Sequence, residues 1–89
     1  MPRLIFTSQL RRFLEVPDVL CSALTLRAAL GQAFAANPRL SGYVLDEQGH
    51  MRANVVAFID GRRVDDRVRL DDPLLPDSTV HVLQALSGG

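Results

Sequence analysis

The residues of this chain best suited to chemistry are the last two, Gly88 and Gly89, which follow Leu86 and Ser87. Neither glycine carries a Cβ, so both can lie extended in a tunnel too narrow for any other residue. The terminal carboxylate of Gly89 is then the reactive group. Because a carboxylate is a poor electrophile, we expect it to attack the α-phosphate of ATP, giving an acyl-adenylate that a sulfur or amine nucleophile can displace. In this interpretation the protein is a substrate of another enzyme and not a catalyst.

Residues 86–89 are expected to form a flexible reactive tail. Four extended residues reach at most about 13–14 Å, so the carboxylate can enter a cleft while the folded body stays outside. A small-residue ending also occurs without function, because chain termini tolerate glycine and serine. Glycine is about 7% of average composition, so a Gly-Gly ending arises by chance in about 0.5% of chains. The ending therefore favours a functional tail on a folded body.

Composition describes that body as one small globular domain, residues 1–89. The chain has 89 residues, 47% of them hydrophobic and 22% charged, with a formal net charge of +0. A chain of this size builds one core and leaves little room for an internal active-site cleft. The chain lacks the surplus of basic residues that would predict nucleic-acid binding, and no run approaches the roughly 20 apolar residues of a membrane span. With one cysteine and no signal-peptide pattern, we expect a cytoplasmic protein.

Hydrophobic periodicity predicts one main helix between two β-rich halves. Thr25 is a suitable N-cap, and Asn37-Pro38 should end the helix because the residue before proline is driven out of the α region. The apolar stripe between them has helical spacing, and its members are Leu26, Ala29, Leu30, Ala33 and Phe34.

Strands are predicted on either side of this helix. Asp60-Gly61 is a strong hairpin signal, and a short strand should return from it over 62–64. We expect an irregular connection over 40–46, a turn over 48–50 and one short helical turn over 71–77. The other predicted strands are β-branched and aromatic runs, at residues 3–8, 19–24, 52–59 and 79–85.

The order of these elements is that of an α+β, β-grasp (ubiquitin-like) fold. It predicts a mixed sheet of four or five strands with one main helix across one face. A right-handed crossover through the helix places the last strand beside the first, in the middle of the sheet. The tail would then follow a central strand.

With this order and this ending, the chain resembles the ubiquitin-like sulfur carriers, such as the molybdopterin synthase small subunit and the thiamine sulfur carrier. Residues 6–11 resemble the family's first strand and turn, and residues 54–61 resemble its central hairpin. Residues 72–83 resemble its last turn and strand, and Gly88-Gly89 completes the pattern. Residues 84–87 differ from those of two of these carriers and leave the pathway open, among molybdopterin, thiamine and cysteine biosynthesis.

The resemblance implies a carrier that binds no cofactor itself. A ubiquitin-activating-type adenylyltransferase would use ATP and a sulfur donor to convert Gly89 to a thiocarboxylate, and a sulfur-accepting synthase subunit would receive the sulfur. Two other functions stay open. One is a protein modifier conjugated to lysines, and the other is a noncatalytic ubiquitin-like interaction module.

Strand alternation also predicts a partner-docking face. If the alternate set Leu4, Phe6, Val55, Ala57, Ile59, Val80 and Val82 points toward the helix, the residues between them point outward. An exposed apolar set of this size predicts a partner. Either Phe58 or Leu83 could instead lie under the 40–46 connection. The predicted partner-binding residues combine the outward set with the tail: Ile5, Val56, Phe58, His81, Leu83, Leu86 and Ser87.

Other reactive side chains have simpler interpretations. Cys21 lies in an apolar run, where a free cysteine is usually a small core residue. His50 and His81 have no ligand-spaced neighbours, so no metal site is expected. Three serines, Ser8, Ser22 and Ser87, lack a recognisable histidine and acid arrangement. The alternating charges over 62–72 predict a solvated edge.

Overall fold

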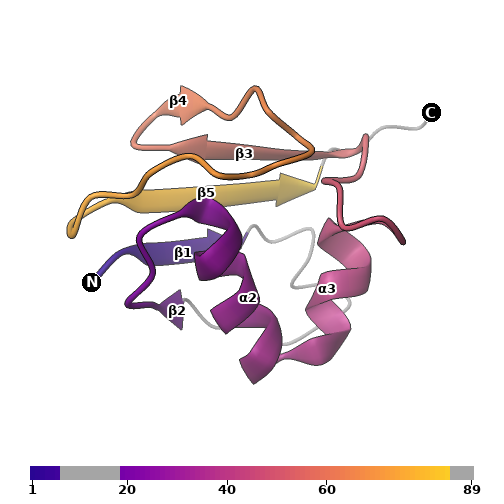
Figure 1. Cartoon of the computed structure of the whole chain (residues 1–89), viewed down its shortest axis with the longest axis horizontal. Coiled ribbons are helices and arrows are strands. Elements are labelled where there is room, and N and C mark those ends of the chain that lie inside the picture. Colours follow the sequence, from indigo (N-terminus) through magenta and orange to yellow (C-terminus); the bar gives the residue numbers. More distant parts are fainter. Residues whose placement is uncertain (7–18, 85–89) are drawn as a thin grey trace.

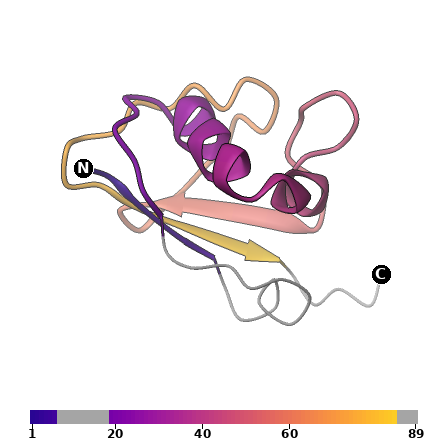
Figure 2. The same ribbon diagram turned by 90° about the horizontal axis from the view of Figure 1, so that it is seen from below.

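The computed structural model describes residues 1–6 and 19–84, and these residues form one five-stranded sheet with two helices on one face (Figures 1 and 2). The strand order across the sheet is β2-β1-β5-β3-β4. In chain order the elements are β1 (Arg3–Phe6), β2 (Val19–Leu20), α2 (Leu26–Ala36), α3 (Pro38–Val44), β3 (Val55–Ile59), β4 (Arg62–Arg63) and β5 (Thr79–Gln84).

The last strand, β5, lies in the middle of the sheet. It runs parallel to β1 and antiparallel to β3. β1 in turn pairs with β2 in antiparallel orientation. The prediction that the crossover through the helix brings the last strand beside the first is therefore confirmed.

The helix α2 begins and ends where its capping residues predict. Thr25 has an extended backbone, and its Oγ1 accepts a hydrogen bond from the Ala28 amide at 3.2 Å. Asn37 follows the last helical residue, and its amide donates to the Ala33 carbonyl. The apolar stripe faces the sheet, with Phe34 half-buried and four members fully buried: Leu26, Ala29, Leu30 and Ala33.

The prediction of an irregular connection over 40–46 is wrong, because residues 38–44 form the helix α3. Pro38 sits in the first turn, where its missing N–H costs nothing and its fixed φ suits a helix. Leu40 and Val44 are four residues apart, share one face and are both buried. The proline that ends α2 thus begins a second helix, and Leu45 then bridges to Met51 across the predicted 48–50 turn.

Two other sequence predictions need correction. β3 begins at Val55 and not at Arg52, because a turn occupies the residues just before it. Residues 71–77 form no helical turn, since Pro73 pairs with Thr25 in an antiparallel bridge and Leu74 donates to the Leu24 carbonyl. Residues 72–74 supply backbone partners to the chain that enters α2, and Pro76 and Asp77 form a turn closed by the Ser78 amide and the Leu75 carbonyl.

The Asp60-Gly61 hairpin turn is confirmed. Asp60 has φ +50° and Gly61 has φ +85°, and positive φ at both central residues is the geometry that matches the twist of two paired strands. The turn pairs Ile59 with Arg62 and Phe58 with Arg63.

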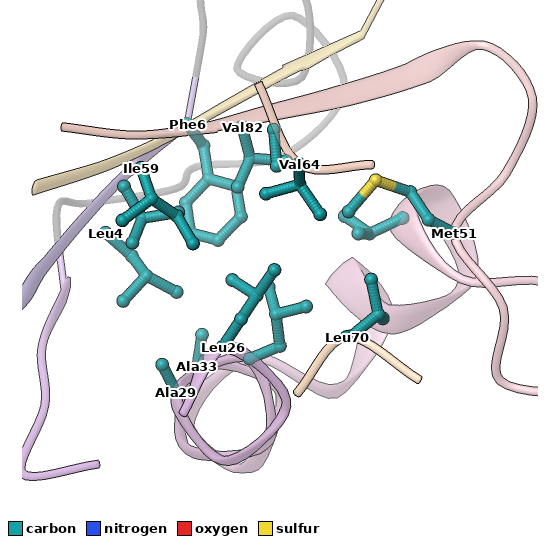
Figure 3. Packing of buried hydrophobic residues seen from close by; sticks show 14 of the residues in the cluster. Leu4, Phe6, Leu26, Ala29, Ala33, Met51, Ile59, Val64, Leu70 and Val82 are labelled. Carbon is teal, nitrogen blue, oxygen red and sulfur yellow. The ribbon is translucent and has the colours of Figure 1, made fainter. Parts of the chain in front are cut away.

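The core lies between the helices and the sheet, as Figure 3 shows. Leu4 and Phe6 from β1 meet Val82 from β5 and Leu26 from α2 there. Cys21 is fully buried, and its Sγ lies 3.5 Å from the Pro2 carbonyl, as expected of a core cysteine. Each predicted inward strand residue is buried: Leu4, Phe6, Val55, Ala57, Ile59, Val80 and Val82.

Three arginines hold the long connections by donating to backbone carbonyls. Arg27 of α2 donates to the carbonyls of Gly49, Val68 and Arg69. Arg52 donates to the Gly42 carbonyl. Arg67 donates to the carbonyls of Arg52 and Val55. The predicted solvated edge over 62–72 is therefore wrong at Arg67, which is half-buried, and at Val64 and Leu70, which belong to the core.

Candidate functional site

The face of the sheet opposite the helices carries the predicted docking residues. His81 is exposed, and the other four described members are half-buried: Ile5, Val56, Phe58 and Leu83. None of these five belongs to the core cluster under the helices. The burial alternation along β1, β3 and β5 thus follows the predicted period of two. We call this surface the outer face.

Strand register gathers these residues into a compact group. His81 on the central strand lies opposite Ile5 on one side and opposite Phe58 on the other. Leu83, two residues further along β5, lies opposite Val56. Directly opposite residues on neighbouring strands share a face, so Ile5 and Phe58 flank His81 and the Leu83–Val56 pair lies next to them.

The outer face also includes residues that the sequence analysis missed. Arg63 lies opposite Phe58, and Arg3 lies opposite Thr79 and Leu20. The signal for Arg63 was present, because a two-residue Asp60-Gly61 turn sets that pairing. Leu20 is 58% exposed. The described strand residues of this face therefore combine apolar side chains with two arginines and a histidine, and they include no acidic residue.

The alternative in which Phe58 or Leu83 lies under the 40–46 connection does not hold. Leu40 and Val44 pack into the core on the helical side of the sheet. Figure 2 shows α3 beside α2 on that same side. Among the described residues, the helices α2 and α3 therefore leave the outer face uncovered.

The route to the carboxyl terminus begins at the end of β5. Gln84 is the last described residue, and it lies opposite Val55, the first residue of β3. The Val55 carbonyl accepts a hydrogen bond from Arg67 at 2.5 Å, which anchors this end of the sheet. The predicted tail residues lie outside the described part of the chain: Leu86, Ser87, Gly88 and Gly89.

At the opposite end of β5, one carboxylate holds the strand in place. Asp60 Oδ1 accepts from the Thr79 amide at 2.9 Å, and its Oδ2 accepts from Ser78 Oγ at 2.9 Å. These two hydrogen bonds, with the Thr79 bond as the larger cause, lower the pKa of Asp60 below its ordinary value. The carboxylate is therefore anionic at neutral pH.

Residues 1–6 and 19–84 present neither a metal-binding cluster nor a membrane-spanning helix. No group of three or more histidine, cysteine, aspartate or glutamate side chains there is arranged to hold a metal ion. His50 and His81 do not meet, since His50 follows the 46–49 turn and His81 lies in the sheet. No helix in these residues combines the length and apolar composition that crossing a membrane requires.

Comparison with solved structures places this architecture in a known fold class. No protein-family model and no curated protein sequence matches the chain. A chain of the BexX/CysO complex of Amycolatopsis orientalis superposes with a TM-score of 0.84 at 13% identity, covering 100% of both chains. SAMP1 of Haloferax volcanii superposes with a TM-score of 0.80 at 16% identity, covering 99% of this chain and 98% of its own.

A third neighbour is the small archaeal modifier protein SAMP1 of Methanosarcina acetivorans, with a TM-score of 0.79 at 18% identity. It covers 99% of this chain and 95% of its own. The protein thus has the α+β, β-grasp (ubiquitin-like) fold. At these identities the comparison shows the fold alone. This fold is the one that the resemblance to the sulfur carriers implies.

Proposed function

We propose that this protein is a ubiquitin-like carrier whose working atom is the terminal carboxylate of Gly89. A partner adenylyltransferase supplies ATP, and attack of the carboxylate on its α-phosphate releases pyrophosphate. A sulfide equivalent from the partner then displaces AMP and leaves a thiocarboxylate. A sulfur-accepting synthase subunit takes the sulfur in molybdopterin, thiamine or cysteine biosynthesis, in the cytoplasm.

The observation that carries this proposal is the position of Gln84. It ends the central strand of a ubiquitin-like sheet, and Gly88-Gly89 lie four and five residues beyond it. Five extended residues span at most roughly 17 Å, enough to separate the reactive carboxylate from the body that a partner holds. A carrier function requires both this reach and a chain that ends at Gly89.

A second function, protein modification, is favoured by the neighbours described as small archaeal modifier proteins. An amine would then displace AMP and form an isopeptide bond. All ten basic residues of this chain are arginines, and arginine stays protonated and is not an acyl acceptor. Conjugates of this modifier would therefore be single additions to other proteins and not chains built through its own side chains.

Intact-mass measurement of the protein from its native host tests the proposal. A carrier shows the mass change for replacement of one oxygen by sulfur at the terminal carboxylate. Alkylation of the thiocarboxylate then increases that mass further. A modifier instead leaves residues 70–89 on target lysines after trypsin, because no basic residue follows Arg69. An unmodified protein under conditions of active sulfur transfer, or a chain that continues past Gly89, would contradict both functions.

Tail variants test the narrow-tunnel argument directly. Gly88→Val adds a branched side chain where bare backbone is proposed to pass, so it should abolish ATP-dependent adenylation, whereas Ser87→Ala should leave it nearly unchanged. Deletion of Gly88-Gly89 should also abolish adenylation with unaltered thermal unfolding, since terminal residues add little to a core. Equal adenylation rates for Gly88→Val and Ser87→Ala would show that no such tunnel exists.

A further inference from the structure

A small apolar pocket opens beside α2, on the helical side of the molecule and away from the outer face. It has a volume of about 140 Å³. A cavity of about 150 Å³ with a similar aliphatic and aromatic lining takes up benzene, so this pocket fits one leucine or phenylalanine side chain. Its walls come from α2, from the start of the 46–50 turn and from the connection before β5, and are formed by Arg27, Leu30, Gly31, Phe34, Leu45 and Leu70.

Gly31 gives this pocket its open rim. It lies in the middle of α2, where glycine is less favourable than any ordinary residue except proline. A Cβ built at Gly31 meets nothing within 4 Å, and its backbone is not among those with positive φ. Neither packing nor backbone geometry within the described chain therefore requires glycine here. What its small size does provide is access to the pocket.

Arg27 supplies a fixed positive charge at the same rim. Its Nε donates to the Arg69 carbonyl at 2.8 Å, and its Nη2 donates to the carbonyls of Val68 and Gly49 at 2.7 and 3.1 Å. All of these acceptors are backbone carbonyls, so none of these hydrogen bonds pairs the guanidinium with a carboxylate. Nη1 makes no hydrogen bond to the described residues and is left to bind an acceptor from outside.

We infer that this pocket binds a segment of a partner protein in which a leucine or phenylalanine is followed by an aspartate or glutamate. The apolar side chain fills the space between Phe34, Leu45 and Leu70, and the carboxylate accepts hydrogen bonds from Arg27. Because α2 and the outer face lie on opposite sides of the sheet (Figure 2), this segment and a partner on the outer face can bind together. The inference does not depend on the reactivity of Gly89.

Peptide titration of the full-length, ¹⁵N-labelled protein tests this inference. The probe is acetyl-Gly-Leu-Asp-Gly-amide, compared with the same peptide carrying Asn for Asp or Ala for Leu. We expect saturable amide shifts centred on Gly31, Leu45 and Leu70 with the Leu-Asp peptide, weaker binding with Leu-Asn and none with Ala-Asp. Absence of saturable shifts, shifts centred elsewhere, or equal binding of the Leu-Asp and Ala-Asp peptides would overturn it.

A paired variant separates binding from folding. Gly31→Leu puts a good helix former in the middle of α2, so it should raise the unfolding temperature. Its side chain also lies over the mouth of the pocket, so it should lower the affinity for the Leu-Asp peptide by about tenfold or more. Ala36→Leu is the matched control, because Ala36 is an exposed residue of α2 outside the pocket and its variant should bind normally. If the Gly31→Leu variant binds the Leu-Asp peptide as tightly as the Ala36→Leu variant does, the pocket is not the binding site.

Discussion

Asp60 joins three parts of the molecule with a single side chain. Its backbone forms the β3–β4 turn, one carboxylate oxygen receives the Thr79 amide at the start of β5, and the other receives the Ser78 hydroxyl. Ser78 Oγ in turn accepts from the Leu75 amide at 2.9 Å. The side chain therefore fixes where the central strand begins.

The lowered pKa of Asp60 predicts how stability changes with pH. Because the folded pKa lies below the ordinary value of 3.8, the unfolded chain binds the proton more tightly. The stabilisation is then complete above that ordinary value and is lost as pH falls through the folded pKa. Asp46 and Asp66, whose pKa values are lowered mainly by backbone amides, act in the same direction.

Asp60→Asn should be less stable than the wild type at pH 7, and the difference should shrink as pH falls below about 4. Asparagine tolerates positive φ, so the turn survives while the charge is lost. Urea unfolding at several pH values measures this, with the exposed Asp65→Asn as control. A stability difference that stays constant from pH 7 to pH 3 would contradict the assignment.

At the scale of elements, Arg67 completes the edge of the sheet. β4 is only two residues long and pairs with the end of β3, so the first residues of β3 have no strand partner on the edge that faces β4. The Ala57 carbonyl on that side accepts from the Val64 amide, and the Val55 carbonyl, two residues away, accepts from Arg67. A guanidinium thus replaces the next backbone donor of the ladder, beside the end of β5.

Replacing Arg67 with alanine should lower the free energy of unfolding by about 2 kcal/mol, because the carbonyls of Val55 and Arg52 lose their side-chain donor. Lysine should recover only part of the loss, since its single ammonium lacks the planar fork of donors. Urea denaturation compares these variants with Arg39→Ala, an exposed arginine of α3. If Arg67→Ala lowers the free energy of unfolding no more than Arg39→Ala does, water donates to these carbonyls as well as Arg67 does.

On the scale of the whole molecule, the sheet separates the core from the outer face. The helices cover one side, and the other side presents apolar residues around His81 with Arg3 and Arg63 nearby. We propose that the adenylyltransferase docks there through an apolar surface with an acidic rim, because complementary charge guides association. Docking on this face would hold β5 and leave the residues after Gln84 to enter the active site.

Phe58→Ala and Leu83→Ala should each weaken binding to the activating enzyme by roughly 30-fold, because anchors of this kind at an interface centre commonly contribute about 2 kcal/mol or more. Stability should change by about 1 kcal/mol or less, since both side chains lie outside the core. Calorimetric titration and chemical denaturation measure the two effects.

Leu24→Ala is the matched control for the outer face, because Leu24 is a 75% exposed leucine that belongs to none of the sheet strands. It should leave binding unchanged. Normal binding by both Phe58→Ala and Leu83→Ala would exclude the outer face, and losses of several kcal/mol in stability would place these residues in the core.

Local sequence patterns determined most of the fold. Thr25 and Asn37 bound α2 because capping depends on residues only a few positions away. Asp60-Gly61 specifies its hairpin because few residue pairs accept positive φ at both positions. The period of two in β1, β3 and β5 assigned each strand residue to its face, since neighbouring side chains on a strand point in opposite directions.

Only the tertiary structure decided what depends on distant partners. Residues 38–44 are helical because Leu40 and Val44 pack into the core. Residues 73 and 74 take no helical turn because Thr25 and Leu24 pair with them. The same holds for Arg27 and Arg67, whose carbonyl acceptors are mostly far away in the sequence. Local propensity cannot determine such contacts, because their free energy is gained only when separate segments of the chain meet.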